Sequence, residues 1–111
     1  PNEKHNYLGK KTMLLTNRKV YSTANLFTSA LKLAENVTQI GGITGGGGGM
    51  PMTHYLPNGW IVVFPANVLL DTNKEHNENG IVPDIEVTMT EEEISAGYDA
   101  IIERAISEFR K

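Results

Sequence analysis

The chain has 111 residues, a formal net charge of −3 and no cysteine. This length allows one domain at most, and the polar opening after Pro1 leads us to expect an internal piece of a longer protein. The ten lysines and arginines are scattered, which argues against a nucleic-acid or anionic-membrane surface. No apolar run approaches a membrane span, and without cysteine there is no disulfide, thiol nucleophile or cysteine-ligated zinc.

The first half of the chain predicts a strand–helix–strand unit. Residues 12–15 form a short apolar run typical of a buried strand, and a break at residues 17–19 leads into a helix. We expect the apolar face of this helix to pack on the sheet and Thr28 and Ser29 to lie on the opposite face. The apolar face consists of Leu26, Phe27, Ala30, Leu31 and Ala34. A second strand at residues 37–40 follows, and this order favours an α/β fold with a right-handed parallel crossover.

The middle of the chain predicts a β-hairpin. Two β-rich runs, residues 52–56 and 60–64, flank an Asn-Gly turn, which is a strong hairpin signal. Residues 66–70 are a candidate edge strand. Residues 71–79 are polar and are predicted to form a loop.

The C-terminal part predicts a brief strand at residues 85–87 and two helices. Thr90 and Glu93 have the spacing of a capping box for one short turn, which Gly97 ends. The last helix is expected to begin near Asp99 and to have an apolar stripe. The stripe consists of Ile101, Ile102, Ala105, Ile106 and Phe109.

Ser22 lies where the first predicted strand turns into the first helix, which makes it a candidate nucleophile. The first turn of a helix has unpaired N–H groups and a positive potential, and both favour an oxyanion that develops beside a serine hydroxyl. The alternative is that Ser22 or Thr23 caps the helix, which is the commoner task of such a residue.

The glycine-rich loop, residues 45–49, invites comparison with a phosphate-binding nest. Met50 and Pro51 follow it where a P-loop needs a Lys-Ser or Lys-Thr pair, which argues against a nucleotide site. A mobile surface connection is the alternative interpretation.

The three histidines carry weak signals. His76 with Glu75 and Glu78 lacks the helical spacing of metal ligands, so the sequence predicts neither a metal nor a cofactor. His5 lies in the N-terminal segment, and neither His54 nor His76 has the sequence context of a catalytic base.

Four short segments follow one another at defined intervals: residues 15–25, 43–48, 56–60 and 80–85. The leucine-proline-x-glycine hairpin, followed by glycine-isoleucine-x-proline-aspartate, is the most specific part of this pattern. In this order the segments resemble the C-terminal processing (tail-specific) serine peptidase family, which includes the tricorn core protease and the retinoid-binding interphotoreceptor repeats. The resemblance extends from about Lys11 to the terminal helix.

This resemblance implies that residues 1–111 are one partial domain, the C-terminal half of a crotonase/ClpP-like α/β catalytic domain. Ser22 then matches the nucleophile, and the backbone N–H of Thr23 matches one donor of the oxyanion hole. Gly47 stands where the tail-specific branch has its lysine base, so a Ser-Lys dyad is not expected.

The match is therefore to the lysine-free branch, which is similar to tricorn and to the retinoid-binding repeats. Its base is a histidine from the N-terminal half, held through a second serine and a downstream glutamate. Glu78 matches this glutamate, and the alternative is an ordinary solvated carboxylate in a loop.

The implied function is that of a serine endopeptidase or C-terminal processing peptidase, which acts through an acyl-enzyme and needs no cofactor. The alternative is a catalytically silent domain of the same fold that binds a hydrophobic ligand or a peptide. Expected partners are a peptide or protein substrate and either the missing N-terminal half or a second copy, without nucleic acid. The family setting favours the periplasm or cell envelope of a bacterium. The isolated chain is expected to be inactive.

Overall fold

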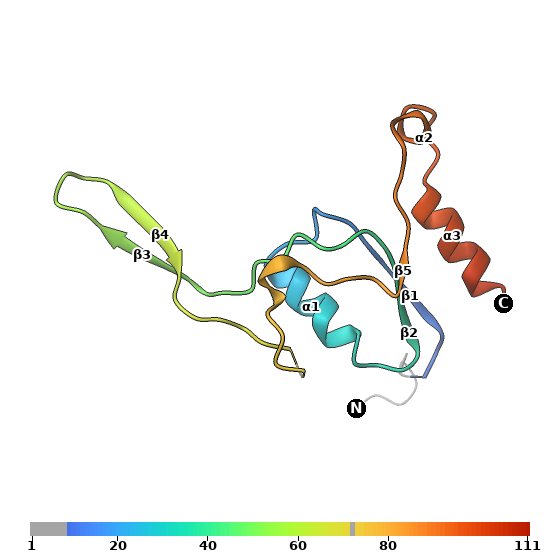
Figure 1. The fold of residues 1–111 in the computed structure, drawn as a ribbon, viewed down its shortest axis with the longest axis horizontal. Helices are drawn as coiled ribbons and strands as arrows, with labels where there is room; N and C mark the ends of the chain where they lie inside the picture. Colours follow the sequence, from blue (N-terminus) through green and yellow to red (C-terminus); the bar gives the residue numbers. More distant parts are fainter. Residues whose placement is uncertain (1–8, 72) are drawn as a thin grey trace, which may run out of the picture.

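The computed structural model describes residues 9–71 and 73–111. Its elements are β1 (Thr12–Thr16), α1 (Thr23–Leu31), β2 (Val37–Gly41), β3 (Pro51–Tyr55), β4 (Ile61–Pro65), the 3-10 helix η2 (Asn77–Asn79), β5 (Ile85–Glu86), α2 (Glu91–Ser95) and α3 (Ala100–Phe109). Figure 1 shows β1, β2 and β5 between α1 and α3, and the β3–β4 hairpin extending away from them. This is the mixed α/β arrangement that the sequence predicts.

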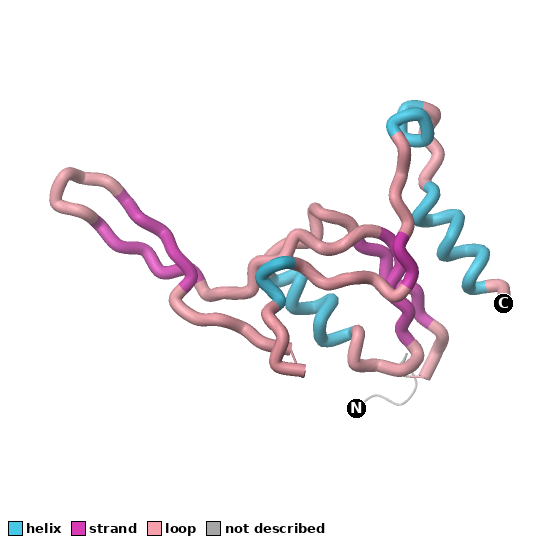
Figure 2. Tube along the Cα trace, in the orientation of Figure 1, coloured by secondary structure: helices cyan, strands magenta, loops and turns pink. Residues whose placement is uncertain are grey.

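Strands β1, β2 and β5 form a parallel sheet in the order β1-β2-β5 (Figure 2). The register of the first pair runs from Thr12 opposite Val37 to Thr16 opposite Gly41. Strand β5 adds only a short pairing, with Ile85 opposite Ile40. Helix α1 connects β1 and β2 in the chain, and the two strands pair in parallel, which confirms the predicted strand–helix–strand unit.

Strands β3 and β4 form the predicted antiparallel hairpin, in a separate two-stranded sheet. The turn contains Gly59 at φ 86°, a left-handed conformation that glycine adopts without steric cost. Both strands are exposed along their whole length. A two-stranded hairpin is marginal in water by itself, so this one lacks the covering surface that normally stabilises such a sheet.

The candidate edge strand at residues 66–70 is wrong. The Ala66 N–H donates to the Met50 carbonyl and the Asn67 side chain accepts the Met50 N–H, which ends the hairpin at its base. The following segment leaves the sheet, and Leu70 forms only an isolated bridge with His76. The apolar composition of residues 66–70 favoured a strand, but no neighbouring strand is available to pair with it.

Helix α1 forms where predicted, but the face that it buries is not the predicted one. Its buried residues are Asn25 and Thr28, whereas Phe27 is 60% exposed. Thr28 can be buried because its hydroxyl donates to the Ala24 carbonyl, which satisfies the polar group within the helix. The packing of α1 on the described chain therefore depends on polar side chains, and much of its apolar face is open.

The C-terminal helices begin where the sequence predicts, and α2 has the predicted capping box. Thr90 and Glu93 form a complete capping box at α2, and the Asp99 side chain accepts two N–H groups at the start of α3. Helix α3 packs on β1 and β2, where Ala105 is buried. The rest of its apolar stripe is only partly covered, since Phe109 is 55% exposed.

The apolar core of the described residues is small. Ile40 and Ala105 are the buried hydrophobic residues, whereas the larger set of buried side chains is polar. The radius of gyration is 17.7 Å, compared with about 13 Å for a compact domain of this length. No helix in residues 9–71 and 73–111 is long and apolar enough to cross a membrane.

Candidate active site

Ser22 lies at the junction between an extended segment and helix α1. Tyr21 bridges to Gly46, the Ser22 N–H donates to the Gly46 carbonyl at 2.9 Å, and α1 begins at Thr23. Ser22 has φ 58° and ψ −124°, a conformation that L-residues rarely adopt and that costs about 1–3 kcal/mol. Its side chain makes no capping hydrogen bond. The hydroxyl is thus exposed at a strained turn and does not act as the helix cap.

Ser22 and Glu78 line the same cavity, which has a volume of about 220 Å³. One wall comes from the base of the β3–β4 hairpin, including Val63 and Phe64, and another from Tyr21. Residues far apart in the sequence therefore meet at one site. The cavity combines a serine hydroxyl, a carboxylate and apolar walls.

Glu78 is held by the glycine-rich loop. Its Oε1 atom accepts the N–H of Gly48 at 3.1 Å and the N–H of Gly49 at 2.9 Å. The residue is half-buried, so the solvated-loop interpretation does not describe it. The loop forms an anion nest, as its composition allows, but the anion is the chain's own carboxylate.

The glycines of this loop are packed into the fold, which contradicts the interpretation as an unpacked surface connection. Gly46 and Gly48 are buried. Gly47 has φ 71°, and a Cβ there would lie 2.6 Å from Cζ of the Tyr21 ring. A lysine at Gly47 would therefore need both a strained backbone and displacement of Tyr21.

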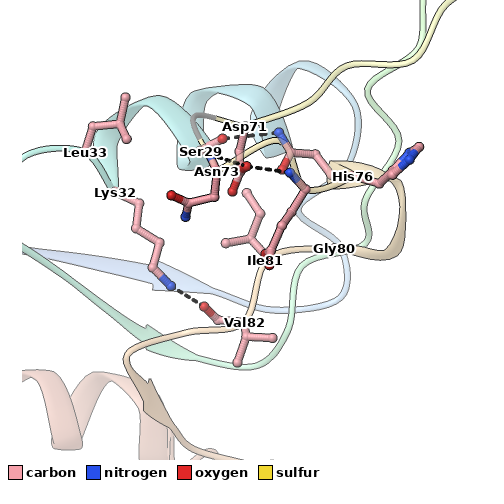
Figure 3. Close-up of a pocket in the computed structure, with 11 residues that line it drawn as sticks. Ser29, Lys32, Leu33, Asp71, Asn73, His76, Gly80, Ile81 and Val82 are labelled. Atoms are coloured by element: carbon pink, nitrogen blue, oxygen red, sulfur yellow. Dashed lines mark hydrogen bonds between the residues drawn. The ribbon is translucent and has the colours of Figure 1, made fainter.

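Neither described histidine lines the cavity of Ser22. His54 lies on the exposed strand β3, and His76 lines a separate cavity of about 340 Å³ between α1 and the segment before β5. Figure 3 shows the His76 imidazole at the edge of that cavity, directed away from Ser29 and Lys32. His5 is outside the described residues. Among the described residues there is no cluster of three or more histidine, aspartate or glutamate side chains that could hold a metal ion.

Thr23 is the first residue of α1, and its backbone N–H has no acceptor in residues 9–71 and 73–111. The N–H groups of the first helical turn have no partner within the helix, so this donor is available beside the Ser22 hydroxyl. Such a donor is suited to an oxyanion because the helix fixes its position.

Sequence reasoning missed a buried polar cluster behind the site. Asn25 and Thr44 are fully buried, and the Thr44 hydroxyl donates to the Asn25 side-chain oxygen at 2.5 Å. The Asn25 amide donates to the Asn77 carbonyl at 3.0 Å, in the residue before Glu78. An asparagine three residues after Ser22, on the helix face opposite to the apolar stripe, is the sequence signal that could have pointed to this cluster.

Several solved structures resemble the chain in fold. A candidate peptidase from Parabacteroides merdae is 48% identical, with a TM-score of 0.82, over 87% of this chain. The tricorn protease is 24% identical with a TM-score of 0.75 over 89% of this chain, and mature CPAF is 24% identical with a TM-score of 0.66 over 74%. The chain covers 31%, 10% and 16% of these three chains, respectively.

A search of curated proteins gave no match to this chain. The profile of peptidase family S41 matches residues 2–87, which is most of the sequence. That span includes Ser22, the glycine-rich loop, the hairpin and Glu78. The chain therefore belongs to peptidase family S41.

Proposed function

We propose that this chain is part of the catalytic domain of a serine peptidase, an endopeptidase or C-terminal processing peptidase, with Ser22 as the nucleophile. The observation that carries the proposal is the geometry of Ser22. Its hydroxyl is exposed at a strained turn, at the N-terminus of α1, on a cavity that it shares with Glu78. Membership of peptidase family S41 supports the reaction class.

The proposed reaction proceeds through an acyl-enzyme. A histidine from the part of the protein outside this chain takes the Ser22 proton, and Ser22 attacks the peptide carbonyl. The Thr23 N–H and a second amide from that part stabilise the oxyanion, and water then hydrolyses the ester. Glu78 orients the histidine. This role is supported by the bonds from Gly48 and Gly49, which fix the Oε1 atom of Glu78 and leave its second oxygen for the histidine. The lysine-free branch of the family is favoured by Gly47, which has no proton-accepting side chain.

The hairpin offers a means of binding an extended substrate. The Ala66 N–H donates to the Met50 carbonyl, and hydrogen-bonded pairs alternate along an antiparallel ladder. Val63, opposite Thr53, therefore directs its N–H and C=O toward the free edge of β4. A peptide that adds to this edge as a further strand would pass the cavity of Ser22, since Val63 lines that cavity.

The described residues also support the proposal of a partial domain. The chain buries few apolar side chains, its hairpin is exposed on both strands, and it covers 31% of the Parabacteroides chain. Exposed apolar surface of this extent marks contacts with further protein. We assign these contacts to the N-terminal half of the domain, with a second copy of the chain as the alternative.

The test is Ser22→Ala in the full-length protein, assayed on fluorogenic peptides and with a fluorophosphonate probe that labels activated serines. We expect loss of both turnover and labelling, without unfolding, because Ser22 makes no capping bond. Ser107→Ala, at an exposed position of α3, is the matched control and should retain both. Wild-type turnover in Ser22→Ala would contradict the assignment.

A binding domain without catalysis is the second candidate, and the exposed apolar hairpin favours it. A folded full-length protein that neither cleaves peptides nor labels at Ser22 would support this candidate. Binding of the same peptides, measured by fluorescence anisotropy, would then be unaffected by Ser22→Ala and weakened by changes in the hairpin.

A further inference from the structure

Three segments that carry the candidate site are joined by buried hydrogen bonds behind it. The Asn25 side chain lies on α1, Thr44 precedes the glycine-rich loop, and Asn77 precedes Glu78 in η2. Asn25 and Thr44 are 0% exposed and Asn77 is 6% exposed. A buried amide or hydroxyl without a partner is costly, so these groups strongly constrain one another.

The bonds link each segment to the next. Asn25 donates from Nδ2 to the Asn77 carbonyl at 3.0 Å and accepts the Thr44 hydroxyl at Oδ1. The Thr44 Oγ1 atom also accepts the Ile81 N–H at 2.7 Å, and the Asn77 amide donates to the Ser29 hydroxyl at 3.2 Å. Helix α1 is thereby fixed against both sides of the segment that carries Glu78.

The glycine-rich loop completes the connection on the side of the cavity. The Gly46 carbonyl accepts the Ser22 N–H, and the Gly48 and Gly49 N–H groups bind the Glu78 carboxylate. Two sets of contacts thus fix the position of Glu78 relative to Ser22. One runs through the glycine-rich loop, and the other runs through the buried cluster around Asn25.

We propose that Asn25 is a positioning residue for the proposed reaction, and that it acts through Thr44 and Asn77 to hold Glu78 in register with Ser22. This inference rests on the proposed function for its kinetic consequence. Its structural consequence can be measured without any activity. If the cluster is broken, Glu78 releases the Gly48 and Gly49 N–H groups, because η2 and the loop before it are no longer fixed to α1.

The first experiment is hydrogen–deuterium exchange of the segment spanning residues 45–50 in the full-length protein. Thr44→Val removes the hydroxyl at nearly constant volume, and Thr44→Ser restores it. We expect exchange at Gly48 and Gly49 to become about tenfold or more faster in Thr44→Val and to stay near the wild-type rate in Thr44→Ser. Asn25→Ala should give the same acceleration as Thr44→Val.

Thr28→Val is the matched control. Thr28 is 2% exposed on the same helix, but its hydroxyl donates to the Ala24 carbonyl and not to the cluster. Thr28→Val should leave exchange at residues 45–50 unchanged. Equal acceleration in Thr28→Val and Thr44→Val, or no acceleration in Thr44→Val, would overturn the proposal. If Asn25→Ala does not fold, the comparison of Thr44→Val with Thr44→Ser still tests the proposal.

A double-mutant cycle tests the kinetic consequence. Asn25→Ala should lower kcat about 10- to 100-fold with little change in KM, since it displaces an orienting group and no substrate contact. In a Glu78→Gln background, Asn25→Ala should lower kcat little further, because the carboxylate through which Asn25 acts is already absent. Additive losses would contradict action through Glu78. A wild-type protein without Ser22-dependent turnover would refute the proposed function, while the exchange experiment would still decide the positioning role.

Discussion

The Ser22–Glu78 region and the β3–β4 hairpin differ in which side chains are buried and which are exposed. Around α1, the glycine-rich loop and η2, the fully buried side chains are polar and hydrogen-bonded, including Asn25 and Thr44. In the hairpin, apolar residues such as Ile61 and Val63 are about 60% exposed. Hydrogen bonds fix geometry within this chain, whereas apolar surface requires a further surface to cover it. The geometry of the site is therefore set by hydrogen bonds among the described residues, whereas those residues leave the hairpin uncovered.

The largest effect is expected from a glycine substitution that contrasts the two regions. Gly46 and Gly59 have φ 79° and 86°, but a Cβ at Gly46 would overlap the Glu78 carbonyl, whereas at Gly59 it meets nothing within 4 Å. Gly46→Ala should lower the free energy of unfolding by about 2–5 kcal/mol, and Gly59→Ala by about 1–2 kcal/mol. Urea unfolding measures both. Equal losses would mean that close packing does not distinguish the loop from the hairpin turn.

The second effect concerns turnover. Glu78→Gln keeps an oxygen that can accept the Gly48 and Gly49 N–H groups but removes the charge. Turnover on peptides should fall about 10- to 100-fold, with KM nearly unchanged, because the change disturbs an orienting group. Glu75→Gln, an exposed carboxylate nearby, is the control and should have no effect. An unchanged kcat in Glu78→Gln would leave Glu78 with a purely structural role in the loop.

The third effect concerns association through the hairpin. The isolated 111-residue chain should show no peptidase activity and should self-associate, since its apolar hairpin has unpaired edges. Ile61→Lys should shift light-scattering masses toward the monomer, because a charged edge strand disfavours pairing. Ser107→Lys on α3 adds the same charge elsewhere and should change little. A wild-type chain that is monomeric and cleaves peptides would show that the site is complete without further contacts.

The smallest effect is expected from pH at the C-terminal end of α3. The pKa of the Glu108 carboxyl is lowered, chiefly because Lys111 donates to it at 2.8 Å, with Arg104 also donating at 2.9 Å. A lowered pKa in the folded state stabilises the protein above the unfolded pKa, and this stability is lost as pH falls through the folded pKa. The melting temperature should therefore rise with pH through the acid range, slightly less steeply in Glu108→Gln. Glu103→Gln, on the same helix without an ion pair among the described residues, should keep the wild-type slope.

Elements whose signals are local could be predicted from the sequence. The capping box of Thr90 and Glu93, the start of the last helix near Asp99 and the hairpin turn at Gly59 each depend on residues within a few positions of one another, so local spacing was sufficient to predict them. The strand–helix–strand unit and the position of Ser22 at its turn followed from periodicity. Glu78 was predicted from the family resemblance and not from a local pattern.

The burial of polar groups, and the partners that they bind, depend on contacts between segments that are distant in the sequence. The periodicity of α1 predicted that Leu26 and Phe27 would face the sheet, but its buried residues are Asn25 and Thr28, and Asn25 is bonded to Asn77 of η2. Periodicity records only the polarity of each face, and it cannot reveal that a polar residue has a buried partner from a distant segment. The same holds for the glycine-rich loop, since the N–H groups of Gly48 and Gly49 bind the Glu78 carboxylate, which lies 30 and 29 residues away in the chain.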